Sequence, residues 1–343
     1  MNGSGRSFKH QWGVQMGVKL RDVVSPRRIR LEDLRGRSVA VDAANTLYQF
    51  LSSIRQRDGT PLMDSMGRVT SHLSGILYRT AAVMEREIRP VYVFDGRSHH
   101  LKGETVSRRV DDRKKSEMEW KRALEEGDID RARKYAVRSS RMSPDIVESS
   151  KRLLELLGIP YVQAPGEGEA QASYMVKRGD AWAVASQDYD CLLFGAPRVL
   201  RNLTLSGKLE DPEIIELEST LRELSISHKQ LVDMALLVGT DFNEGVRGIG
   251  ARRGLKLIRE KGDIFKVIRD LEADIGGDPE VLRRIFLEPE VSEDYEIRWR
   301  KPDVDGVIEF LCLEHGFSEE RVRAALKKFE GASSTQKSLE DWF

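Results

Sequence analysis

Acidic residues stand directly after short apolar runs at several points of this chain. The runs SVAV, VYVF and YVQAPG each lead into a carboxylate, AWAVASQ leads into an Asp-x-Asp pair, and one more acid follows the helix-like segment LVDMALLVG. The acids are Asp42, Asp95, Glu167, Glu169, Asp188, Asp190 and Asp241. Each β-rich run is typical of a short buried parallel strand. Because strand ends in an open α/β sheet face one crevice, these side chains are predicted to converge.

Carboxylates that are packed together repel one another and take up protons unless a cation offsets the repulsion. Hard oxygen ligands favour Mg²⁺ or Mn²⁺. For a single acid after a strand, a helix N-cap or an Asx-turn is the ordinary role. The pairs 167–169 and 188–190 favour a metal site instead, since their i, i+2 spacing in a turn can aim both carboxylates at one ion. The cluster as a whole predicts a divalent-metal centre.

The elements that must position these acids follow a repeating βα order. Residues 37–97 alternate strand, helix, loop, helix and strand. A helix then begins at its cap Ser143, with Pro144 in the first turn, and ends at Gly158. Strand PYVQA, helix AQASYMVKRG and strand AWAVAS come next. The sequence therefore predicts an α/β fold, with a mostly parallel central sheet covered by helices.

Residues 102–141 differ from the rest of the chain in their composition. They carry thirteen Lys and Arg against nine Asp and Glu, a net charge of +4, and too few apolar residues for a core-facing stripe. Helices that are polar nearly all round project into solvent or bridge other parts of a structure. A solvated helical insertion and a functional one both fit this composition. The position just after the strand end at Asp95 favours the functional interpretation.

A glycine-rich turn, GVRGIGARRGLKLIRE, follows Asp241. Glycines at a helix N-terminus expose backbone amides, which can bind phosphate groups. A turn between two helices also needs glycine for its geometry alone. Four cations beside Gly248 and Gly250 favour backbone binding of nucleic acid; they are Arg247, Arg252, Arg253 and Lys256.

Composition excludes several other classes of protein. The 343 residues are 40% hydrophobic and 33% charged, with a net charge of +0. Cys191 and Cys312 form no CxxC, and the six histidines show no zinc spacing. No apolar stretch approaches the ~18 residues of a membrane span, and no signal peptide is evident. We expect a cytoplasmic, monomeric protein.

The two ends of the chain differ from the body. Residues 1–15 are polar and Gly/Ser-rich, and we expect them to be an extension outside the fold. Residues 331–343 are expected to be a flexible tail, in which GASST is a tether to QKSLEDWF.

Several stretches together resemble the flap endonucleases, structure-specific 5′ nucleases of DNA replication and repair, and especially the archaeal type. The matching stretches span nearly the whole chain from Met16: VDAANTLYQFL, TSHLSGILYRT, PVYVFDG, GIPYVQAPGEGEAQAS, SQDYDCLLFG, GTDFNEGVRGIG and QKSLEDWF. The resemblance implies a single nuclease domain over residues 16–330, with residues 102–141 as a helical arch and residues 239–260 as a helix–two-turn–helix element. It also implies 5′ flap endonuclease and 5′–3′ exonuclease activity on branched DNA.

The resemblance also assigns roles to residues. It implies two Mg²⁺ ions, replaceable by Mn²⁺, with Asp42, Asp95, Glu167 and Glu169 forming the first group and Asp188, Asp190 and Asp241 the second. Lys102 and Arg109 match residues that contact the scissile phosphate, and Tyr48 matches an aromatic on which a base stacks. Arg55 and Arg79 join the glycine-rich turn in the expected DNA-binding set, and that turn is expected to hold K⁺. The tail resembles a sliding-clamp peptide, formed by Gln336, Leu339, Trp342 and Phe343.

Two alternatives stay open. One is a related metal-dependent 5′ exonuclease or an RNase of the PIN-type fold, against which the arch insertion and the tail argue. The other is a non-catalytic DNA-binding clamp adaptor, in which the acids have only a structural role.

Overall fold

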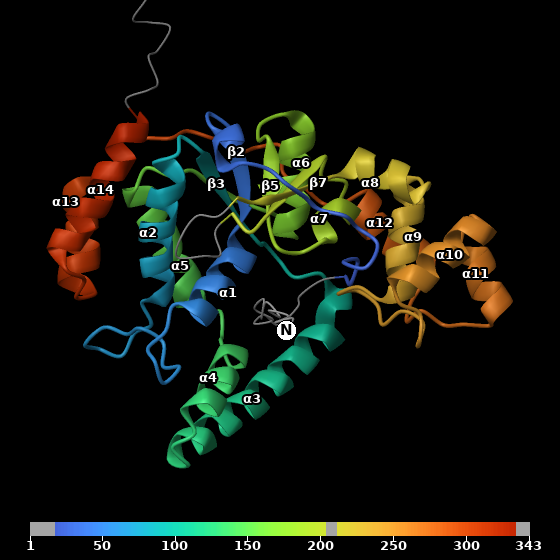
Figure 1. The fold of residues 1–343 in the computed structure, drawn as a ribbon, viewed down its shortest axis with the longest axis horizontal. Helices are drawn as coiled ribbons and strands as arrows, with labels where there is room; N and C mark the ends of the chain where they lie inside the picture. Colours follow the sequence, from blue (N-terminus) through green and yellow to red (C-terminus); the bar gives the residue numbers. More distant parts are fainter. Residues whose placement is uncertain (1–17, 204–210, 334–343) are drawn as a thin grey trace, which may run out of the picture.

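A seven-stranded sheet forms the centre of the molecule (Figure 1). The computed structural model describes residues 18–203 and 211–333, so the expectations for residues 1–15 and for the clamp peptide lie outside the described residues. The strand order is β1-β7-β6-β5-β2-β3-β4. The strands are β1 Arg27–Arg28, β2 Ser38–Asp42, β3 Arg89–Phe94, β4 Tyr161–Gln163, β5 Ala183–Ala185, β6 Arg198–Arg201 and β7 Glu213–Glu216.

The predicted mostly parallel sheet is confirmed. Strands β6, β5, β2, β3 and β4 run parallel to one another, while β7 pairs antiparallel with both β6 and β1 at the edge. The four predicted strands correspond to β2 through β5. Strands β1, β6 and β7 were not predicted from the sequence. They are two to four residues long and carry charged ends, so they lack the apolar run that marks the others.

Alternation along the central strands divides the interior into two cores. Val39 and Val41 of β2 belong to one core, whereas Ala40 between them belongs to the other. This follows from the strand period, in which successive side chains point to opposite faces. The helices that complete the two layers are α1 Ala43–Ser53, α2 Ser71–Met84, α5 Pro144–Leu156, α6 Gly168–Arg178, α7 Asp190–Leu193, α8 Leu217–Leu224, α9 His228–Val238, α10 Ala251–Lys261, α11 Ile264–Leu271, α12 Pro279–Leu287, α13 Val304–Ile308 and α14 Glu319–Ser333.

Each layer has its own helices. Helices α1, α2, α5 and α14 supply the core that includes Val39, and α6, α7 and α9 to α12 supply the other. Figure 1 shows the first group at one side of the sheet and α9 to α12 at the opposite side. Helix α14 continues to Ser333, three residues into the segment expected to be a tether.

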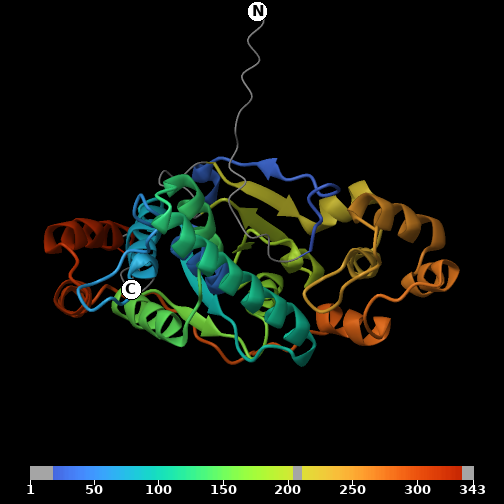
Figure 2. The ribbon, with the colours of Figure 1, turned by 90° about the horizontal axis from the view of Figure 1, so that it is seen from below.

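The charged insertion folds as a pair of helices, α3 Gly103–Glu125 and α4 Ile129–Arg138, that stand out from the body in Figure 1 and lie in front of it in the view from below in Figure 2. Ala123, Ala132 and Ala136 of the pair are fully buried, and Arg131 on α4 donates to Glu119 on α3 at 2.6 Å. Asp128 starts α4 by accepting a hydrogen bond from the Arg131 amide at 3.0 Å. Because so little apolar surface is buried here, the remaining faces stay available to a partner.

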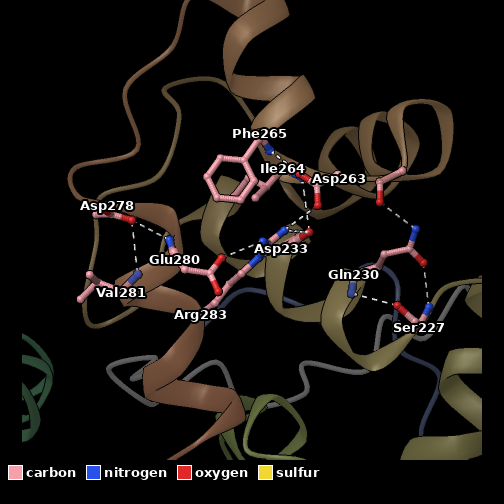
Figure 3. Close-up of polar contacts among 11 residues, drawn as sticks. Ser227, Gln230, Asp233, Asp263, Ile264, Phe265, Asp278, Glu280, Val281 and Arg283 are labelled. Carbon is pink, nitrogen blue, oxygen red and sulfur yellow. Dashed lines mark hydrogen bonds and ion pairs between the residues drawn. The ribbon is translucent and has the colours of Figure 1, made fainter.

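Helices α9, α11 and α12 are held together by one buried ion-pair network, drawn in Figure 3. The Arg283 guanidinium, 2% exposed, binds both oxygens of Asp233 at 2.5 and 2.7 Å. It also donates to Asp263 at 2.9 Å and to Glu280 at 3.2 Å. The Phe265 ring covers it, with its centroid 4.8 Å from the guanidinium carbon. One side chain on α12 therefore binds an acid on α9, an acid at the start of α11 and an acid on its own helix.

Removing Arg283 should leave Asp233 as a buried carboxylate without its cation. We expect Arg283→Ala to lower the free energy of unfolding by about 3–5 kcal/mol, as for other broken buried pairs. Urea unfolding monitored by circular dichroism measures this. The neighbouring exposed Arg284→Ala is the matched control and should change stability little. Equal stability of the two variants would contradict the role given to the network.

Candidate functional site

The acids predicted to converge lie at the carboxyl ends of adjacent strands. Asp42 ends β2, Asp95 follows β3, and Asp188 follows β5. Strand β2 pairs in parallel with both β3 and β5, so the three strand ends lie side by side. Glu169 reaches the same place from the first turn of α6. Carboxylate oxygens of Asp42, Glu169 and Asp188 all lie within 4.8 Å of one another.

Backbone contacts seat the acids individually. Asp42 caps α1 by accepting from the Asn45 amide at 3.0 Å, so the ordinary N-cap role and a place in the cluster coexist. Asp190 accepts from the Val18 amide at 2.7 Å, which joins the start of the described chain to the site. Asp95 accepts from the Gly168 amide at 2.6 Å. A Cβ on Gly168 would lie 2.7 Å from that carboxylate oxygen, which explains a glycine between the two glutamates.

Burial and mutual repulsion shift the titration of these acids. Burial, with Asp95 adding repulsion, raises the pKa of Asp42 to about 7. Burial, with repulsion from Asp241, raises the pKa of Asp190 to about 6. The pKa values of Glu169 and Asp188 are also raised, first by burial and then by Asp190 and Asp42. The pKa of an ordinary carboxyl group lies near 4. Each raised pKa therefore means that the charged form of the acid is unfavourable here, and a bound cation would stabilise that charged form.

Two cations from the base of the helical pair contact the acids. The Lys102 ammonium forms an ion pair with Glu167 and lies 3.9 Å from Asp241, and Arg109 donates to Asp241 at 2.7 Å. Burial lowers the pKa of Lys102, but the attraction of Glu167 and Asp241 outweighs it, so the net direction is upward. Lys102 also lies over the Phe242 ring, 4.9 Å from its centroid. Both residues are thus placed beside the acidic cluster.

The loop that carries Asp241 is fixed by one buried amide. Asn243 accepts from the Thr240 amide and hydroxyl at 3.2 and 2.8 Å, and it donates to the carbonyls of Leu236 and Ile275 at 2.8 and 2.9 Å. This contact could not be anticipated from the sequence, because Ile275 lies 32 residues away from Asn243.

The candidate DNA-contacting residues on α1 and α2 differ in their surroundings. Tyr48 is half-buried; burial raises its pKa, and Arg113, Arg55 and Arg109 oppose that shift. The donors of Arg55 bind the carbonyls of Leu51 and Gly59, each at 2.7 Å, and the Ser140 hydroxyl at 2.6 Å.

Burial without a carboxylate partner among the described residues lowers the pKa of Arg55 to about 10. Its described contacts anchor the loop after α1 to the base of α4. Arg79 is half-buried, and burial lowers its pKa too.

The glycine-rich turn presents its cations to solvent. Gly248 has a φ of +81°, a backbone conformation that favours glycine, and Gly250 caps α10. Arg253 donates to the Gly248 carbonyl at 3.4 Å, and Lys256 lies 3.8 Å from Glu260. All four predicted cations, Arg247, Arg252, Arg253 and Lys256, are exposed.

Sequence reasoning missed three polar residues of the site. Asn45, Gln49 and Ser186 lie between Asp42 and Asp188 or directly behind them. The signal in the sequence was that Asn45 and Gln49 are polar residues in a largely apolar helix, and that Ser186 is a polar residue at the end of an apolar strand.

The raised pKa values predict that the metal-free site opposes folding at alkaline pH. The stability contributed by an acid with a raised pKa is fully present below about pH 4 and is lost as pH rises through about 6 to 7. Glu169→Gln should therefore raise the melting temperature in EDTA at pH 8 by roughly 2 °C or more, and by less at pH 5. Differential scanning fluorimetry at both values measures it, with exposed Glu288→Gln as control. A lower melting temperature than wild type at pH 8 would refute the repulsion argument.

Within residues 18–203 and 211–333, no helix is both long and apolar enough to cross a membrane.

Comparison with known proteins gives one consistent assignment. The XPG N-terminal domain matches residues 16–116, and the XPG I-region matches residues 158–241. Flap endonuclease 1 of Methanothermobacter thermautotrophicus is 94% identical over 328 residues, covering 96% of this chain and 100% of that protein. The solved flap endonuclease-1 from Methanococcus jannaschii superposes with a TM-score of 0.77 at 44% identity, covering 94% and 100% of the two chains.

The catalytic core of Rad2 in complex with a DNA substrate superposes with a TM-score of 0.69 at 25% identity, covering 89% of this chain and 96% of that one. The resemblance inferred from the sequence is thus confirmed over nearly the full length. The chain belongs to the flap endonuclease 1 family.

Proposed function

We propose that this chain is a structure-specific 5′ flap endonuclease, with 5′–3′ exonuclease activity, that acts in DNA replication and repair by two-metal phosphodiester hydrolysis. The observation that carries the proposal is the convergence of acids from several strand ends directly beneath the cationic base of a helical pair. Family membership supplies the activity, and this geometry supplies groups suited to the chemistry.

The residues present fit divalent cations. Three carboxylates offer hard oxygen donors within 4.8 Å of one another, and burial together with mutual repulsion raises the pKa values of Asp42 and Asp190, a cost that a divalent cation would offset. Mg²⁺ is the expected ion, and Mn²⁺ is expected to substitute. When bound, the ions supply an activated water and stabilise the departing 3′ oxygen.

The seven acids are proposed to hold the ions in two groups. Asp42 and Glu169 come from the first group inferred from the resemblance and Asp188 from the second, and the closeness of these three carboxylates supports a common centre for the two groups.

Lys102 and Arg109 are proposed to contact the scissile phosphate. Each already lies within ion-pair distance of an acid of the cluster, so a phosphate held there would meet both cations without a large movement of α3. Fixed cations beside a phosphate stabilise the charge that develops in the transition state. Tyr48, at the edge of the same group of cations, is proposed to stack on a base that unstacks near the cut.

Binding of the duplex is proposed for the glycine-rich turn that follows Asp241. The exposed cations of the glycine-rich turn, with its backbone amides and a K⁺ ion, are proposed to bind the phosphate backbone, while α3 and α4 admit a single-stranded 5′ flap. Backbone contacts fix register and carry no sequence information. Residues 336–343 are proposed to bind a sliding clamp, and the protein is proposed to act as a monomer.

The alternative of a non-catalytic adaptor is disfavoured because the acidic cluster destabilises the fold when no metal is bound. Several half-buried or buried acids with raised pKa values oppose folding, and a protein that only held DNA would have no use for them. A simple exonuclease or an RNase has no evident need for the helical pair above the acids.

A labelled 5′ flap substrate tests the proposal directly. Wild-type protein with Mg²⁺ should release the flap, and EDTA should abolish release. Asp188→Asn should remove cleavage but keep DNA binding, because loss of a negative charge does not weaken attraction to phosphate. Gel-based cleavage and fluorescence anisotropy measure the two properties. Near-normal cleavage by Asp188→Asn with Mg²⁺ would sink the two-metal assignment, and DNA binding without cleavage by wild type would favour the adaptor.

Substitutions at the base of α3 should affect the rate of cleavage, whereas substitutions in the glycine-rich turn should affect DNA binding. Lys102→Ala or Arg109→Ala should slow single-turnover cleavage on the order of a hundredfold with little change in duplex affinity. The double variant Arg252→Glu, Arg253→Glu should weaken binding of all sequences alike and flatten the salt dependence. Lys115→Ala, exposed on the same helix as Arg109, is the control. A binding defect alone in Lys102→Ala would assign that residue to the general basic surface.

A further inference from the structure

Two buried polar residues join the strand ends that carry Asp42 and Asp188. The Asn45 amide nitrogen donates to Asp42 Oδ1 at 3.0 Å, and its side-chain Nδ2 donates to Asp188 Oδ2 at 2.7 Å. The Ser186 hydroxyl donates to Asp42 Oδ2 at 2.9 Å and accepts from the Asp188 amide at 3.2 Å. Asn45 is 6% exposed and Ser186 is 3% exposed. Each residue therefore contacts both acids.

The fold explains why these residues meet. Strands β2 and β5 are parallel neighbours, with Val41 opposite Ala185. The next residues along the two strands are Asp42 and Ser186, which places the hydroxyl beside the carboxylate. Asn45 lies in the first turn of α1, which begins directly after β2. From there its side chain reaches Asp188, which follows β5.

The orientation of the Asn45 amide is fixed from behind. Gln49, one turn later on α1, donates from Nε2 to Asn45 Oδ1. With its oxygen occupied in this way, Asn45 can offer only its nitrogen to Asp188. The bond therefore holds Asp188 Oδ2 in one direction, and among the described residues no hydrogen bond to Asp188 Oδ1 is found.

We propose that Asn45 is a positioning residue for the metal centre: by holding Oδ2 of Asp188 it keeps this carboxylate in the orientation in which it would join Asp42 and Glu169 as ligands of Mg²⁺. This inference rests on the proposed function, in which the acids bind metal. The purely structural alternative is that Asn45 only fills the first turn of α1. An apolar side chain would fill that space without burying an amide, so the specific bond to Asp188 favours the positioning role.

The choice of ion makes the role measurable. Mg²⁺ requires near-ideal octahedral geometry, whereas Ca²⁺ accepts six to eight oxygens in flexible arrangements. A carboxylate free to rotate should therefore weaken Mg²⁺ binding more than Ca²⁺ binding. Residues behind metal ligands typically change metal affinity or activity about 10–100-fold when they are lost.

The experiment compares full-length wild type with Asn45→Ala and Asn45→Leu. Isothermal titration without DNA measures Mg²⁺ and Ca²⁺ affinity, and melting temperatures in EDTA report folding. We expect both variants to weaken Mg²⁺ binding about 10-fold or more, with a smaller loss for Ca²⁺. The Mg²⁺ concentration for half-maximal flap cleavage should rise in parallel, while the rate at saturating Mg²⁺ should largely recover. Gln49→Ala should act in the same direction more weakly.

Ser53→Ala is the matched control, because that exposed hydroxyl on α1 donates only to the Gln49 carbonyl at 2.6 Å. Unchanged Mg²⁺ affinity in folded Asn45→Ala overturns the inference. Equal losses for Mg²⁺ and Ca²⁺, accompanied by a fall in melting temperature, also overturn it and leave Asn45 a structural residue. If wild type itself binds neither ion and cuts no flap, the proposed function fails, and this inference fails with it.

Discussion

Repulsion among acids brought to one edge of a sheet is the constraint on which the rest of this structure depends. Burial and then the repulsion of neighbouring carboxylates raise the pKa values of Asp42, Asp95 and Asp188. The repulsion would drive these acids apart if their strands could move. The strands cannot do so. Two hydrophobic cores, one on each face, hold β2 between β3 and β5 through alternating side chains. The apolar interior therefore maintains a polar arrangement that is unfavourable by itself.

The same repulsion explains why the helical pair begins where it does. Lys102 and Arg109 lie at the start of α3 and contact Glu167 and Asp241, so attraction to the acids holds the base of an otherwise solvent-exposed insertion. Farther along, the side chains of α3 and α4 that are fully buried among those described are alanines. Under the proposed function, a substrate phosphate would compete with Glu167 and Asp241 for the same two cations.

The strand–acid order was readable from the sequence because burial on both faces demands continuous apolar runs, and each run stops at its acid. The unpredicted features depend on contacts between residues far apart in the chain. Asn45 reaches Asp188 across 143 positions, and Asn243 reaches Ile275 across 32. Arg55 is a surface type by composition, yet its donors are used by Ser140 and two carbonyls of the fold. Periodicity reports burial of apolar residues, and it carries no information on which polar partner a side chain finds.

One helical unit carries both Asp241, a proposed metal ligand, and the turn proposed to bind DNA. Helix α9 ends at Val238, Asp241 follows, and the glycine turn leads into α10 within ten residues of that acid. The buried pair of Arg283 with Asp233 fixes α9 against α12, and Asn243 fixes the loop between α9 and α10 (Figure 3). A duplex bound at the turn would then stand at a set distance from the acids. Under the proposed function, this fixed distance would determine which phosphodiester bond lies at the acids, without any contact that reads the base sequence.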